Sequence, residues 1–193
     1  MKKQVILVDC DGVLLDWESA FDAWMSHRGY RINPGGENEY VMSRRYPIPK
    51  SQAIELIRTF NESAAIGYLK PLRDAAWYVR RLHEEHGYVF HCITSLSRDP
   101  NAVRLREMNL HDVFGKTAFE KIICLSTGDD KDSALEPYRD TDCYWVEDKP
   151  ENADVGYDMG LRSILVEHGH NADHQCPYPT VKNWREIYAI ITS

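Results

Sequence analysis

The stretch Val5-Ile6-Leu7-Val8-Asp9-Cys10-Asp11-Gly12-Val13-Leu14 decides the fold of this chain. Its four leading apolar residues, mostly β-branched, are typical of a buried strand in a parallel sheet. Asp9 ends this run and Asp11 follows two residues later. Charged groups at the end of a buried strand cost free energy unless something compensates them. Because open α/β sheets bind ligands at the carboxyl ends of their strands, we expect a site here.

The spacing of the two carboxylates indicates a chemistry. Side chains at i and i+2 of an extended chain point the same way, so Asp9 and Asp11 are expected to face one pocket. Together they would attract a hard dication such as Mg²⁺, which prefers oxygen ligands. One carboxylate can then attack phosphorus while the other handles the proton of the leaving group. The alternative is a strand followed by an ordinary Asp-Gly turn.

Composition bounds the class of protein. The length of 193 residues suits one domain with room for a small insertion. A formal charge of −7 argues against a partner that is a nucleic-acid polymer. The five cysteines are scattered without a CxxC pair, as expected in a reducing cytoplasm. No stretch has transmembrane length, and the apolar run after Lys2 and Lys3 is too short for a signal peptide.

Residues 17–69 differ in character from the rest of the chain. An apolar stripe at helical spacing follows Asp16, and from Gly29 onward the segment is rich in loop residues, with no clear buried strand. Ser51 is expected to cap a further helix. We interpret residues 17–69 as a small helical cap that excludes water and selects the substrate. Arg44 and Arg45 would contact an anionic substrate, unless they form a solvated charge pair.

The remaining residues alternate between strands and helices. Buried strands are predicted at 88–94, 121–125, 143–146 and 163–166, and helices at 73–86, 100–110, 153–159 and from 183 onward. This alternation predicts a Rossmann-like, doubly wound parallel sheet with right-handed crossovers, formed by residues 1–16 and 70–193. The cap is then an insertion after the first strand.

Polar residues follow the other predicted strands at the same end. They are Thr94-Ser95, Lys131 in the loop after the third strand, and Glu147-Asp148. A hydroxyl and nearby backbone N–H groups can hold a phosphoryl oxygen. The order of these residues, together with Asp9-Cys10-Asp11-Gly12, resembles the four motifs of the haloacid dehalogenase superfamily.

The resemblance implies a role for each motif residue. Asp9 would be the nucleophile that becomes an aspartyl phosphate, and Asp11 the general acid and base. Thr94 would match the second motif. Lys131 would match the third, neutralising the nucleophile and a phosphate oxygen. Lys116 and Lys121 precede the strand and fit less well. The expected Mg²⁺ ligands are Asp9 and Asp11 with Asp148 as first choice and Glu147 as second.

Within the superfamily the chain looks most like the 5′(3′)-deoxyribonucleotidases. The resemblance implies a Mg²⁺-dependent hydrolase of deoxyribonucleoside monophosphates, with Ser95 at the phosphate and Trp17 stacked on the base. A Trp17 packed in the hinge between cap and core is the alternative. The chain departs from the family at Glu147, usually Asp, and at 97–99, usually a lysine-containing loop.

Two other functions are compatible with the sequence. One is the same chemistry on another small phosphomonoester, such as a sugar phosphate, and the other is a catalytically silent nucleotide-binding protein. The intact motif residues argue against silence. The tail holds His168, His170, His174 and Cys176, a spacing that fits no standard zinc site. The oligomeric state, a homodimer among the options, is left open.

Overall fold

The computed structural model describes residues 3–193 around a six-stranded sheet in the order β3-β2-β1-β4-β5-β6. All neighbouring strands are parallel, so the predicted α/β class with a doubly wound parallel sheet is confirmed. β6 was not predicted, because two residues are too short to form a recognisable apolar run. The strands are β1 (Val5–Val8), β2 (Val89–Thr94), β3 (Phe119–Cys124), β4 (Tyr144–Glu147), β5 (Arg162–Val166) and β6 (Thr180–Val181).

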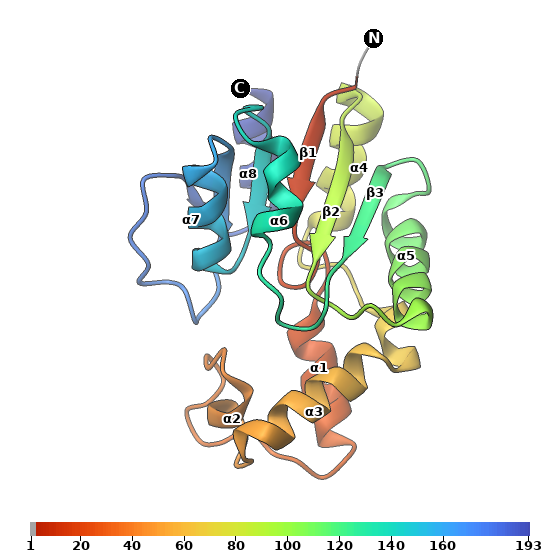
Figure 1. Ribbon diagram of the computed structural model, residues 1–193, viewed down its shortest axis with the longest axis vertical. Coiled ribbons are helices and arrows are strands. Elements are labelled where there is room, and N and C mark those ends of the chain that lie inside the picture. The colour runs from red at the N-terminus through yellow and green to blue at the C-terminus, as the bar shows by residue number, and fades with distance from the viewer. Residues whose placement is uncertain (1–2) are drawn as a thin grey trace.

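Helices cover both faces of the sheet (Figure 1). Ile6 and Val8 point into the larger apolar core, which includes residues of α4, α5 and α8. Leu7 points to the opposite face, where it packs with Leu135 of α6 and with Trp145. The helices are α1 (Trp17–Ser26), α2 (Met42–Arg45), α3 (Lys50–Asn61), α4 (Ala75–His86), α5 (Pro100–Phe114), α6 (Asp132–Leu135), α7 (Pro150–Asp158) and α8 (Trp184–Thr192), with 3-10 turns η1 (Ala64–Tyr68) and η2 (Glu136–Tyr138).

Local signals in the sequence set most helix ends. Asp16 caps α1 by accepting from the Ser19 amide, and Asp99 caps α5 by accepting from the Asn101 and Ala102 amides. The predicted cap at Ser51 is wrong. α3 begins at Lys50 after Pro49, and no side-chain hydrogen bond caps it. The predicted helix 73–86 begins only at Ala75, because Arg73 has a positive φ of 46°.

Helices α1, α2 and α3 gather below the carboxyl ends of the strands (Figure 1). Gly67, in the 3-10 turn η1 after α3, packs closely against α5. A Cβ added at Gly67 would lie 3.0 Å from the side chains of both Leu105 and Met108. No helix within residues 3–193 is long and apolar enough to cross a membrane.

Candidate active site

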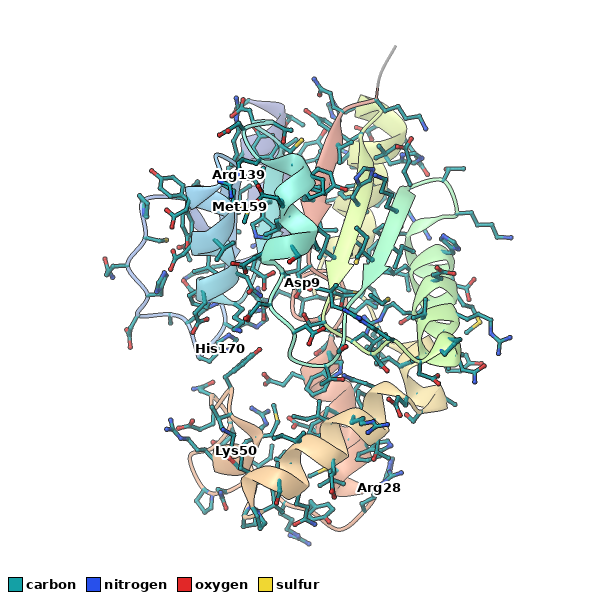
Figure 2. All side chains as sticks on the ribbon, in the orientation of Figure 1. Asp9, Arg28, Lys50, Arg139, Met159 and His170 are labelled. Carbon is teal, nitrogen blue, oxygen red and sulfur yellow. The ribbon has the colours of Figure 1, made fainter. Side chains whose placement is uncertain are left out.

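Three buried carboxylates meet where the strand order reverses. Asp9 follows β1, Glu147 ends β4, and Asp148 comes next in the chain. The Asp9 amide extends the pairing of these neighbouring strands by donating to the Val146 carbonyl at 2.9 Å. Each carboxylate offers an oxygen within 4.8 Å of the other two. Figure 2 labels Asp9 at this edge, where α/β sheets bind their ligands.

Lys131 lies among these carboxylates. It directly precedes α6, and its Nζ is 2.6 Å from Oδ1 of Asp9 and 2.7 Å from Oε2 of Glu147. Burial by itself lowers the pKa of Lys131, but the two carboxylates outweigh this effect and raise the pKa above its ordinary value. The ammonium therefore stays charged and compensates part of the negative charge of the site.

Asp148 is the least compensated of the three carboxylates. Burial raises the pKa of Asp148 well above its ordinary range, and the charges of Glu147 and Asp9 raise it further. Glu147 is engaged by Lys131 and by the Lys149 amide, which donates to Oε1 at 3.0 Å. A hard dication such as Mg²⁺ fits this oxygen-rich donor set, with Asp148 as the better-placed carboxylate of the acid pair.

Two residues far away in the sequence lie close against Asp148. Gly12 has a φ of +82°, and a Cβ placed on it would lie 2.8 Å from Cγ of Asp148. Asn171, in the loop after β5, donates from Nδ2 to the Asp148 carbonyl at 2.6 Å. Asn171 was not among the predicted site residues, because only the fold brings this loop to the acid pair.

The Asp11 carboxylate lies outside the group of three carboxylates. β1 ends at Val8 and the chain bends at Cys10, before Asp11. Arg106 of α5 instead donates from Nη1 to Oδ1 of Asp11 at 2.6 Å and from Nη2 to Oδ2 at 3.0 Å. Asp11 still lines the same cavity as Asp9. Its carboxylate is therefore engaged by Arg106 rather than by the three clustered carboxylates.

Arg106 was missed, although its position carried a signal. It lies on the buried stripe of α5 between Ala102 and Leu110, each four residues away. A charged residue on such a stripe needs a buried partner. Burial raises the pKa of Asp11 and the guanidinium of Arg106 opposes that effect.

Two hydroxyl residues at the end of β2 lie in the same cavity as Asp9. Thr94 is the last residue of β2, next to β1 in the sheet, and is almost completely buried. The Ser95 hydroxyl donates to the Asp129 carbonyl at 2.7 Å, which ties the loops after β2 and β3 together. Both residues line the cavity with Asp9 and Lys131.

The cavity extends from these groups to the helices α1 and α3 and has a volume of about 760 Å³. Trp17, at the start of α1, lines it. One face of the indole stacks on Phe21 with ring centroids 4.7 Å apart, and Nε1 donates to Oδ1 of Asn61 at 2.9 Å. Trp17 is thus both part of the packing between α1 and α3 and part of the cavity wall.

Arg44 and Arg45 lie outside the cavity lining. Arg44 is exposed, whereas the Arg45 guanidinium is buried against Asp22 and Glu18. Arg45 therefore holds the segment around α1 and α2 together, and neither arginine is placed to contact a substrate in this conformation.

The tail residues divide between two places. His168 and His170 line the cavity, and Nε2 of His168 lies 2.7 Å from the Gly12 carbonyl. His170 faces Tyr40 across the mouth, with ring centroids 4.8 Å apart; it is labelled in Figure 2. His174 instead faces Asp154, and the Cys176 thiol donates to the Tyr178 carbonyl.

Sequence comparison gives limited information. No family model matches the chain. The chain is 26% identical over 129 residues to an uncharacterized 32.4 kDa protein of the Gp30-rIII intergenic region of Enterobacteria phage T4. The match covers 63% of this chain and 45% of the phage protein. The chain thus spans less than half the length of this relative.

Solved structures agree on the fold. A haloacid dehalogenase-like hydrolase of Streptococcus pneumoniae, SP0104, matches with a TM-score of 0.66 at 15% identity, covering 98% of both chains. The HAD-hydrolase YfnB of Bacillus subtilis, bound to magnesium, matches with 0.64 at 13% identity over 100% of both chains. CbbY of Rhodobacter sphaeroides, in complex with phosphate, matches with 0.59 at 16% identity over 96% of both chains. The chain therefore has the fold of haloacid dehalogenase-like hydrolases.

Proposed function

We propose that the protein is a Mg²⁺-dependent phosphomonoester hydrolase of the haloacid dehalogenase superfamily. One observation carries the proposal: the buried Asp9 carboxylate lies 2.6 Å from the Lys131 ammonium and shares its crevice with Glu147 and Asp148. A nucleophile held beside a cation and an acidic metal site is what in-line attack on an anionic phosphate requires. The phosphate and magnesium complexes among the structural neighbours agree with this chemistry.

The chain's own residues account for each step. An oxygen of Asp9 attacks phosphorus, the bond from phosphorus to the leaving oxygen breaks, and Asp11 donates a proton to that oxygen. Water then attacks the phosphorus of the aspartyl phosphate, Asp11 takes the water proton, and the Asp9 carboxylate is released with inorganic phosphate. Lys131, Thr94 and Ser95 stabilise the phosphoryl oxygens during both steps.

Asp9 and Asp148 would hold the Mg²⁺ ion, with Glu147 in support. When bound, the ion supplies positive charge that lets an anionic nucleophile approach an anionic phosphate. Asp11 is left out of this ligand set, because Arg106 engages both of its oxygens.

We further propose a deoxyribonucleoside monophosphate as substrate and residues 17–69 as the cap that selects it. Trp17 lines the cavity wall contributed by this segment, and a flat base would stack on its indole. The second candidate, a sugar phosphate, needs no such aromatic surface.

Free cysteines at all five positions are consistent with a reducing cytoplasm.

A panel of phosphomonoesters with Mg²⁺ tests the proposal. It should include deoxyribonucleoside 5′- and 3′-monophosphates, sugar phosphates and p-nitrophenyl phosphate, each assayed by release of inorganic phosphate. The highest kcat/KM is expected for deoxyribonucleoside monophosphates. If a sugar phosphate is the best substrate, the proposed phosphomonoester hydrolysis stands and the proposed nucleotide specificity is refuted. If no member of the panel is turned over, both proposals are refuted.

A further inference from the structure

Arg106 is a completely buried cation next to the reacting groups. It projects from α5, and its guanidinium donates to both oxygens of Asp11, at 2.6 Å and 3.0 Å. Nη1 also lies 2.6 Å from Sγ of Cys10, the residue between Asp9 and Asp11 in sequence. Nε is buried and has no hydrogen-bond partner among the described residues. Arg106 therefore commits its hydrogen bonds to the segment that carries the nucleophile and the general acid.

Stability of the fold is a poor reason for this arrangement. Removing a guanidinium from water costs free energy that a single ion pair does not reliably return. Asp11 is the carboxylate that pairs with Arg106 in the described part of the chain. An apolar residue would continue the buried stripe of Ala102 and Leu110 without that cost. The free-energy cost of burying Arg106 has a reason if the ion pair serves the chemistry of Asp11.

We infer that Arg106 is a positioning residue for proton transfer by Asp11. A bidentate contact fixes both the direction and the plane of the carboxylate, which a single hydrogen bond does not do. Each carboxylate oxygen keeps a further lone pair, and Asp11 lines the cavity in which the leaving group must lie. Arg106 thereby holds the proton-carrying edge of Asp11 toward the substrate without itself reaching the cavity lining.

This inference rests on the proposed function and has a distinct kinetic consequence. A leaving group that is a poor base, such as p-nitrophenolate, departs without a proton, whereas a sugar or nucleoside alkoxide needs one. Loss of Arg106 should therefore lower kcat/KM for alkyl phosphates and spare kcat/KM for p-nitrophenyl phosphate. The comparison uses kcat/KM because it covers only the steps up to departure of the leaving group, whereas the later hydrolysis of the aspartyl phosphate uses Asp11 for both classes.

The experiment is a double-mutant cycle of Arg106→Met and Asp11→Asn, assayed on both classes of phosphate at saturating Mg²⁺. We expect Arg106→Met to reduce kcat/KM for the alkyl phosphate by at least about tenfold, a part of the ~10²–10⁴-fold that general acid–base catalysis contributes. In the Asp11→Asn background the same substitution should cause no further loss. Arg104→Met is the matched control, since Arg104 is an exposed arginine of the same helix that bonds only to the Asn101 side chain.

Three results would overturn the inference. They are an equal loss of kcat/KM on both classes of phosphate, additive losses in the double mutant, and unchanged kcat/KM for the alkyl phosphate in a folded Arg106→Met protein. If Arg106→Met does not fold, Arg106→Lys takes its place in the cycle, because it keeps the charge and removes the bidentate contact. Failure of the proposed function is recognised separately, by turnover that survives Asp9→Asn.

Discussion

Gly12→Ala tests whether the close contact of backbone and acid pair serves metal binding. Gly12 has a φ of +82°, and a Cβ added there would lie 2.8 Å from Cγ of Asp148 and closer still to Oδ2. Gly29 is a matched control, because its φ is +84° and a Cβ added there would meet nothing within 4 Å. Both variants place an L-residue in the left-handed region, but only Gly12→Ala must also displace Asp148.

The strain of the left-handed backbone and the displacement of Asp148 differ in size and are measured by different experiments. The left-handed conformation costs roughly 1–2 kcal/mol for an L-residue. For a chain of this length, each kcal/mol lowers Tm by about 2–4 °C. Both variants should show this loss by calorimetry without Mg²⁺. Gly12→Ala should in addition bind Mg²⁺ about 10–100-fold more weakly, the usual effect of disturbing groups that orient a metal ligand.

Isothermal titration with Mg²⁺ measures the effect of displacing Asp148 without relying on turnover. Gly29→Ala should bind Mg²⁺ like the wild type, and Gly12→Ala should not. Equal Mg²⁺ affinity in the two variants would refute the reasoning, because the Asp148 carboxylate would then tolerate the displacement that the added methyl group forces.

Three further predictions concern the acid pair, the metal and the cavity wall. Asp148→Asn should abolish turnover yet raise the Tm of the Mg²⁺-free protein. The folded-state pKa of Asp148 is raised above its ordinary 3.8, so the ionised carboxylate lowers stability as the pH rises above that value. Calorimetry in EDTA should therefore show that Asp148→Asn raises Tm more at pH ~8 than at pH ~5. A Tm below that of the wild type would contradict this prediction. EDTA should remove activity reversibly and Ca²⁺ should restore it poorly, as phosphate release would show; full activity after chelation would exclude the metal. Trp17→Ala should lower kcat/KM for nucleoside monophosphates more than for p-nitrophenyl phosphate, whereas a uniform loss with a fall in Tm would assign Trp17 to packing with Phe21.

The fold was largely predictable from local patterns. Apolar runs marked β1, β2, β3, β4 and β5, and their alternation with amphipathic segments implied parallel crossovers. The predicted helix 100–110 begins at Pro100, where Asp99 caps it, and the predicted helix 73–86 ends at His86, just before Gly87. What failed was local detail that depends on backbone conformation, such as the start of α3 at Lys50. Single-residue capping preferences do not decide between neighbouring positions when Pro49 already fixes the entry to the helix.

The site was predictable only where its residues follow strands. Asp9, Thr94, Lys131, Glu147 and Asp148 lie at strand ends or in the loops after them, so the parallel topology alone brings them to one edge. The pairing of Asp11 with Arg106 was not predictable, because α5 is far from Asp11 in the sequence. Long-range packing determines the contacts of Asn171 and Arg106. No pattern within a short window contains that information.

In the proposed mechanism the phosphoryl group is transferred to Asp9. The most direct measurement is mass spectrometry of the protein after acid quench of a single turnover, followed by peptide mapping of the phosphorylated residue. Wild-type protein with Mg²⁺ should carry a hydroxylamine-sensitive phosphoryl group on Asp9, and Asp9→Asn should carry none. A phosphoryl group on another residue, or turnover by Asp9→Asn at the wild-type rate, would contradict the account.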